Sequence, residues 1–139
     1  MSPLPLPASA KPFLPHQPPM AMVETILAND TQCRKASLVI RPGNLFLNGD
    51  GVLDPAVIPE LVAQAAAAAE THRNGGTVSA GFLALGRDIQ IPRPPRVNEE
   101  LFITATDESP LDGWFVINFT MFLADGTTCA TGEISVCRI

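Results

Sequence analysis

The chain has 139 residues, of which 46% are hydrophobic and 17% are charged, and its formal net charge at pH 7 is -5. This length fits a single domain, and the composition supports a packed core and excludes extended disorder for most of the chain. The excess of acidic residues leaves no broad cationic surface for a phosphate backbone, so we expect no nucleic-acid partner.

Neither a membrane span nor a secretion signal is expected. The longest charge-free apolar stretch on a helical pattern covers residues 61–69, far short of the roughly 20 residues that cross a bilayer. The N-terminal segment lacks the positive start and the uninterrupted apolar run of a signal peptide. The cysteines form no CxxC pair, so we predict no disulfide framework and no zinc site, and we expect a cytoplasmic protein. They are Cys33, Cys129 and Cys137.

A proline-rich arm over residues 1–21 precedes a single domain predicted for residues 22–139. Half of the 14 prolines lie in this arm, where missing N–H groups and fixed φ angles prevent a regular helix or a central strand. The arm and its junction also carry side chains that are too apolar to remain in water, so we expect the arm to lie extended across the domain. These side chains are Phe13, Leu14, Met20 and Met22. The alternative is a partly frayed tail.

Strands are predicted on both sides of one helix. Turn-forming residues separate stretches that are rich in apolar and β-branched side chains. The predicted strands cover residues 22–28, 33–40, 81–91, 100–106, 113–123 and 127–138. Two strands, one buried helix and four further strands are most simply arranged as an α+β fold, in which a curved antiparallel sheet wraps around the helix.

The helix begins at Pro55, with Asp54 as its N-cap, or at Pro59, and it ends near Arg73 before an Asn-Gly-Gly sequence. After Pro59 the first turns are apolar on every face except at Glu60 and the residue four positions later. A helix without a polar stripe must be surrounded by protein, so we predict that this helix is buried.

Glu60 and Gln64 share one face of this helix because they are four residues apart. Burial would disfavour the charged carboxylate and so suit a group that exchanges protons near neutral pH, whereas a helix N-terminus favours the anion. The sequence does not decide between these effects. In the purely structural alternative, Glu60 binds N-terminal N–H groups and Gln64 bonds to a neighbouring strand.

Three segments occur in an order that resembles a known family. They are FLPHQPPM at residues 13–20, ELVAQA at residues 60–65 and GFLAL at residues 81–85. Together they resemble the hotdog-fold 3-hydroxyacyl-carrier-protein dehydratases of the FabA/FabZ type, and most of all the predicted-dehydratase subfamily associated with aryl polyene pathways. The resemblance implies a dimer whose active sites lie at the subunit interface, with Glu60 as the catalytic acid of the helix.

The resemblance also implies a substrate carried on the phosphopantetheine arm of an acyl carrier protein, and no cofactor or metal. The thioester carbonyl of such a substrate would be polarised by N–H groups at the start of the helix. The substrate-binding positions expected on this basis are Gln64, Gly51, Ala56, Gly81 and Phe82. Three arginines around a proline-rich turn are either ordinary solvated side chains or a docking site for an acidic carrier protein. They are Arg87, Arg93 and Arg96.

One part of the family pattern is missing. Where the best-known members carry a Gly-His-Phe-Pro loop, residues 48–53 read NGDGVL, so the usual catalytic histidine is absent. The chain offers two other imidazoles. His72 lies twelve residues along the helix from Glu60, about 18 Å away, whereas His16 in the arm matches the family's Leu-Pro-His string. We therefore take His16 as the candidate catalytic partner, and its alternative role is to pin the arm.

Three functions follow from these observations. The first is dehydration of a 3-hydroxyacyl thioester. The second is a catalytically inactive hotdog subunit that pairs with an active homologue or holds an acyl carrier, which the missing loop histidine favours. The third is thioester hydrolysis. A homodimer is expected because a sheet rolled around one helix leaves an exposed edge strand, and a heterodimer with an active homologue is the alternative.

Overall fold

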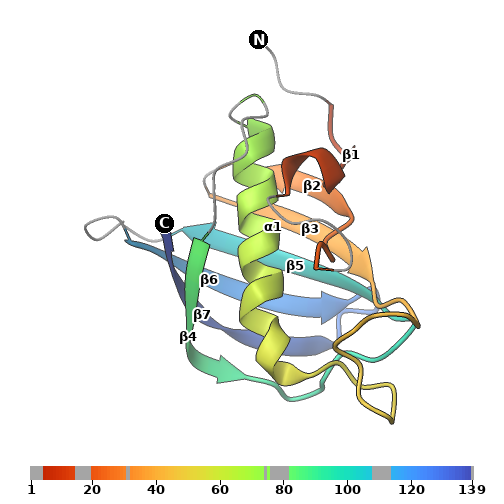
Figure 1. Cartoon of the computed structure of the whole chain (residues 1–139). Helices are drawn as coiled ribbons and strands as arrows, with labels where there is room; N and C mark the ends of the chain where they lie inside the picture. Colours follow the sequence, from red (N-terminus) through yellow and green to blue (C-terminus); the bar gives the residue numbers. More distant parts are fainter. Residues whose placement is uncertain are drawn as a thin grey trace.

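The computed structural model describes residues 5–14, 20–30, 32–73, 75, 82–107 and 114–138 (Figure 1). The strands are β1 (Ala8–Ser9), β2 (Thr25–Asn29), β3 (Arg34–Val39), β4 (Phe82–Gln90), β5 (Glu100–Asp107), β6 (Trp114–Leu123) and β7 (Thr128–Arg138). The helical elements are the 3₁₀ turns η1 (Lys11–Phe13) and η2 (Pro55–Val57) and the α-helix α1 (Ile58–Arg73).

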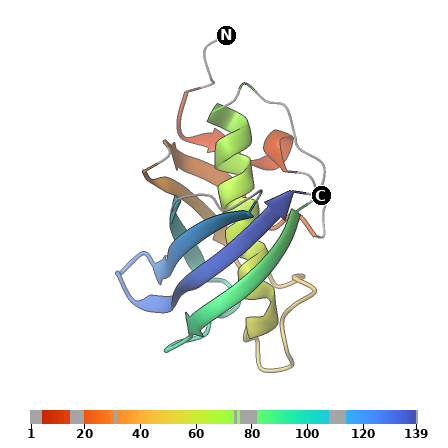
Figure 2. The ribbon, with the colours of Figure 1, turned by 90° about the vertical axis from the view of Figure 1, so that its left-hand side faces the viewer.

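The seven strands form one antiparallel sheet in the order β1-β2-β3-β5-β6-β7-β4. Two views at right angles show the sheet curving around α1, whose axis crosses the strands on the concave face (Figures 1 and 2). The predicted curved antiparallel sheet around one long helix is therefore confirmed, and the fold is α+β. The six predicted strands are all present, with ends that differ by at most three residues.

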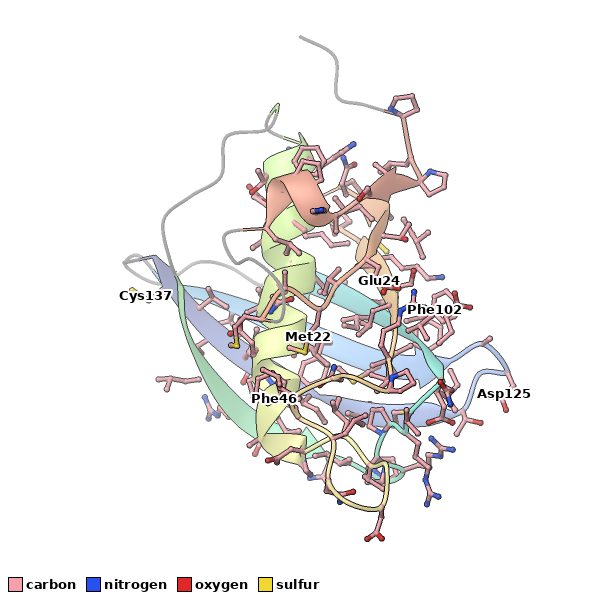
Figure 3. All side chains as sticks on the ribbon, turned by 45° about the vertical axis from the view of Figure 1, so that its right-hand side comes forward. Met22, Glu24, Phe46, Phe102, Asp125 and Cys137 are labelled. Carbon is pink, nitrogen blue, oxygen red and sulfur yellow. The ribbon has the colours of Figure 1, made fainter. Side chains whose placement is uncertain are left out.

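The core lies between α1 and the concave face of the sheet. On β5, Leu101, Ile103 and Ala105 are buried, as expected of alternate residues that face the helix. The five consecutive alanines of α1 are all buried, which confirms the prediction of a helix surrounded by protein. On the opposite face of the sheet, Phe102 stacks on Phe122 with ring centroids 5.7 Å apart (Figure 3).

The start of the helix combines the two predicted positions. The Asp54 carboxylate accepts a hydrogen bond of 2.9 Å from the Ala56 amide and so caps the 3₁₀ turn η2. The α-helix then begins at Ile58, one residue before Pro59, whose missing N–H is tolerated in the first turn. The helix ends at Arg73, as predicted.

Part of the N-terminal arm is built into the domain. Strand β1 pairs with β2, and η1 places Phe13 against the core, where Phe13 and Leu14 are both buried. Met22 is buried as well, whereas Met20 is 40% exposed, contrary to the expectation that all four apolar side chains would be covered. Met20 lies at the start of the segment that approaches α1, where its carbonyl oxygen accepts a hydrogen bond from Nε2 of Gln64.

The cysteines differ in their burial. Cys129 is buried, and burial raises the pKa of its thiol, as in a core residue rather than a nucleophile. Cys137 is only half-buried. In the part of the chain that the structure describes, the helix is too short to span a bilayer.

Candidate functional site

The candidate site is built on the first turns of α1. Glu60 is half-buried there, and its Oε1 accepts a hydrogen bond of 3.1 Å from Nε2 of Gln64, one helical turn further on. This pair follows directly from the four-residue spacing that places both side chains on one face. The carboxylate is thus held by a neutral donor.

Gln64 is the most completely bonded side chain of the site, and only 2% of its surface is exposed. Its Oε1 accepts hydrogen bonds from the backbone N–H groups of Met22 at 2.8 Å and Val23 at 3.3 Å. Its Nε2 donates to the carbonyl oxygen of Met20 at 2.7 Å as well as to Glu60. Gln64 therefore joins α1 to the segment that leads from the arm into β2, and Figure 3 shows Met22 beside the helix.

The loop that replaces the family's histidine loop is tightly folded. Oδ1 of Asn48 accepts hydrogen bonds from the amides of Asp50 at 2.9 Å and Val52 at 3.0 Å. Gly51 has φ of 75°, which favours glycine, and an added Cβ would lie 3.0 Å from a methyl group of Val97. Composition predicted a loop here, and the structure shows that it is a defined turn.

The amides expected to polarise a substrate carbonyl are already engaged. The Gly51 N–H donates to the carbonyl of Asn48 at 3.1 Å, and the Ala56 N–H donates to Asp54. Ile58 donates to the carbonyl of Pro55, and the next residue is a proline without an N–H. A thioester carbonyl would have to displace these partners, so the substrate-binding role of Gly51 and Ala56 remains a prediction.

His72 lies at the far end of the helix and cannot assist Glu60, since the two residues are about 18 Å apart along α1. Its ring is 1% exposed, Nδ1 lies 2.6 Å from Nδ2 of Asn29, and Phe13 packs edge-on at a centroid distance of 5.2 Å. His72 is in the last turn, as expected, but it is buried beneath the arm. His16 lies outside the described residues, so its proposed role is untested.

Two other predicted substrate-binding residues are Gly81 and Phe82. Gly81 lies outside the described residues. Phe82 is the first residue of β4, where its backbone pairs with Arg138. The structure therefore leaves both as predictions.

The three arginines do not form one cluster around a common ligand. Arg93 pairs with the carboxylate of Glu99 and so holds the pKa of that carboxyl below its usual range. The backbone amide of Arg96 donates to the same carboxylate at 2.6 Å, and its side chain is exposed. Arg87 lies apart on β4, exposed and 3.9 Å from the carboxylate of Glu133. Carrier docking by these residues remains a prediction.

The side chains of the described residues form no metal site. Across the described parts of the chain, no three histidine, cysteine, aspartate or glutamate side chains lie close enough together to bind a metal ion.

The fold defines the structural class of the protein. One long buried helix within a curved antiparallel sheet is the hotdog architecture. The family model of the ApeP-like group, described as ApeP dehydratase, matches residues 8–139. The chain therefore belongs to the ApeP-like dehydratase family and is a dehydratase-like hotdog protein.

Solved structures show the same fold. The dehydratase heterocomplex ApeI:P from Xenorhabdus doucetiae matches with a TM-score of 0.82 and 21% identity, over 95% of this chain and 91% of that chain. The E. coli PaaI protein from the phenylacetic acid degradation operon has a TM-score of 0.59 and 18% identity, covering 81% of each chain. A hypothetical thioesterase from Streptococcus pneumoniae TIGR4, solved with coenzyme A, has a TM-score of 0.62 and 10% identity, over 82% of this chain and 84% of that chain. Comparison of the sequence with curated proteins gives no match.

The sequence predicted that Glu60 and Gln64 share one helix face, and its structural alternative gave Gln64 a bond to a neighbouring strand. The structure shows both features, because Met22 and Val23 lie in the strand predicted for residues 22–28, but the bond to Met20 was not predicted. The partners of Gln64 are backbone groups of Met20, Met22 and Val23, more than 40 residues away in the chain. Every residue has similar backbone groups, so residue type does not show which of them bond to Gln64. The sequence indicates only that a buried glutamine in an apolar helix needs partners for both ends of its amide.

Proposed function

We propose that the chain takes part in dehydrating a 3-hydroxyacyl group held as a thioester on the phosphopantetheine arm of an acyl carrier protein. The observation that carries this proposal is the half-buried Glu60, which lies in the first turn of α1 and is held by the buried Gln64. Membership of a dehydratase family supports the reaction class. The acyl-carrier substrate rests on the resemblance to carrier-protein dehydratases.

Dehydration needs two proton transfers. A base removes the proton at C2, the electron pair of that C–H bond forms the C2–C3 double bond, and the C3 hydroxyl leaves as water after taking a proton from an acid. The products are a 2-enoyl thioester and water, with no net change in protons. Glu60 performs one of these transfers as a general acid or base. A second group has to perform or share the other.

We infer that the second group comes from His16 or from a partner chain. Among the described residues the one imidazole, His72, is too far along the helix. Strand β4 offers a place for a partner, because in the described part of the sheet its outer edge has no neighbouring strand and Leu85 on it is 54% exposed. A Cβ added at Gly86 would lie 3.4 Å from Pro59, so this edge runs beside the residue that precedes Glu60. A chain added at β4 would therefore lie beside the start of α1, the part of the helix that carries Glu60.

The alternative is a subunit that does not catalyse by itself. The loop that carries histidine in the best-known dehydratases is here a turn closed by Asn48, and the similar ApeI:P structure is described as a heterocomplex. Both observations favour a partner that is a homologous hotdog subunit. In this case Glu60 and the partner's side chains form one site across the interface.

The test is to incubate the pure chain with 3-hydroxyacyl and 2-enoyl carrier-protein thioesters, alone and with a homologous hotdog subunit. Loss or addition of water by the pure chain supports a complete site. Turnover that requires the second subunit supports the shared site. Release of free thiol without either reaction would contradict dehydration and identify a thioesterase.

A further inference from the structure

The N-terminal arm covers one of the two edges of the sheet. Strand β1 is the last strand on its side of the order β1-β2-β3-β5-β6-β7-β4, and it pairs antiparallel with β2 (Figure 1). We propose that β1 is an edge cap, which occupies the edge of β2 that would otherwise pair with β2 of a second copy of this chain. The described sheet is then open to a further strand only at β4. This inference rests on the fold and does not depend on the dehydration proposed above.

The first residues of β2 have no protection of their own against pairing. The strand reads TILAN, without a proline or a charged side chain, so nothing in its sequence opposes a further strand. Strand β1 pairs with Thr25 and Ile26, and the register between β2 and β3 shifts between Ile26 and Ala28. An irregularity of this kind twists an edge and disrupts its ladder. The cap therefore covers the regular part of the β2 edge and ends where the irregular part begins.

Strand β1 does not offer a new edge in turn. It consists of Ala8 and Ser9 alone, and it is flanked by Pro5, Pro7 and Pro12. Proline has no N–H group to donate to a ladder, and a strand of two residues presents few backbone groups to a neighbour. Short edge strands and prolines are features by which natural sheets avoid edge-to-edge pairing. The cap therefore ends the sheet on this side.

Buried residues that directly follow β1 anchor the cap. The N–H group of Ala10 donates to the carbonyl of Glu24 at 2.9 Å, and Ala10 is completely buried. The next turn, η1, buries Phe13, whose ring packs against His72 of α1 at a centroid distance of 5.2 Å. Because the cap belongs to the same chain, its effective concentration at β2 exceeds that of a second copy in dilute solution. A second copy is therefore excluded from the β2 edge while these anchors hold.

A second copy fits the uncapped edge because two β2 strands can pair about a two-fold axis. Such an axis places identical strands antiparallel, which is the direction in which β1 pairs with β2. If β2 paired in this way and β4 also bound a second chain, every copy would have two pairing edges and the copies would join in rows. With β2 capped, copies that associate through β4 form a closed pair that has β1 at each end.

Ala10→Asp in the full chain tests the cap. A docked arm would have to bury an unpaired carboxylate at a position without exposed surface, so the arm should leave β2. In sedimentation velocity over a concentration series, the weight-average mass should rise with concentration to about twice the wild-type value or more. The matched control Ser9→Asp makes the same change of charge at an exposed position of β1 and should sediment like the wild type.

A second substitution separates edge pairing from non-specific aggregation. Thr25→Lys places a charge on β2 itself, and lysine on an edge strand opposes pairing with another sheet. Added to Ala10→Asp, this substitution should return the mass to the wild-type value, and alone it should leave the mass unchanged. Hydrogen exchange gives an independent readout. The amides of residues 24–28 should exchange faster in dilute Ala10→Asp than in the wild type, and they should regain protection as the concentration rises.

Two results would overturn the proposal. One is a wild-type mass for Ala10→Asp at every concentration. The other is association that Thr25→Lys leaves unchanged, because the contact between copies would then lie away from β2. If Ala10→Asp does not fold, the smaller change Ala10→Ser weakens the same anchor. In that variant, faster exchange at residues 24–28 without recovery at high concentration would overturn the proposal in the same way. None of these measurements depends on enzymatic activity.

Discussion

Replacing Leu85 by lysine tests whether β4 is the edge that binds a second chain. Leu85 is 54% exposed in the single chain, so the substitution should cost little folding stability. Complete burial of a leucine side chain is worth about 1.5–3 kcal/mol, so covering the exposed half contributes about 1–1.5 kcal/mol per copy. A symmetric dimer loses this twice, about 2–3 kcal/mol, which weakens its Kd by about 30- to 150-fold. A heterodimer loses this contribution only once, which weakens its Kd by about 5- to 12-fold.

Sedimentation velocity over a concentration series measures these changes, for the chain alone and with a homologous subunit. The matched control is Leu6→Lys, because Leu6 is 38% exposed and lies just before β1, at the opposite edge of the sheet. This control should associate like the wild type. Equal Kd values for Leu85→Lys and the wild type would refute the assignment of β4 as the interface.

Two further predictions concern stability. Asp54→Ala removes the cap on the Ala56 amide and should cost about 1 kcal/mol, or about 3–5 °C in Tm, whereas Asp54→Asn should recover most of it in a thermal melt. Arg93 lowers the pKa of Glu99, so the ion pair stabilises the fold fully above the ordinary carboxyl value of 4.5 and loses this contribution as the pH falls through the lowered value. The free energy of unfolding of Glu99→Gln should therefore be about 0.5–1 kcal/mol lower than that of the wild type at pH 7. Denaturant titrations should show that the two free energies converge in acid. A difference that stays constant at all pH values would contradict this.

The sequence was informative wherever local patterns determine local structure. Turn residues and apolar stretches gave the six main strands, and the apolar helix gave the core. The start of the helix was left open between Pro55 and Pro59 because each proline fits a first turn. The structure uses both, since Asp54 caps a 3₁₀ turn at Pro55 and the α-helix then begins at Ile58.

Contacts between distant segments were not predictable from these patterns. Strand β1 has only two residues, so it carries no periodicity and was missed. The burial of His72 depends on Phe13 and Asn29, which reach it from the arm and from β2. The exposure of Met20 was predicted wrongly, since the residue is 40% exposed although its carbonyl oxygen accepts a hydrogen bond from Gln64 of the helix.

The most direct test of the central claim is the rate of dehydration by Glu60→Gln. The glutamine keeps the size of the side chain and an oxygen that can accept from Gln64, but it cannot exchange a proton. Turnover should fall about 100-fold or more while the thermal midpoint stays near that of the wild type. The control Glu100→Gln makes the same change of charge at an exposed position of β5 and should keep the wild-type rate. Equal rates for the wild type and Glu60→Gln, with measurable turnover, would remove Glu60 from the mechanism and contradict the account.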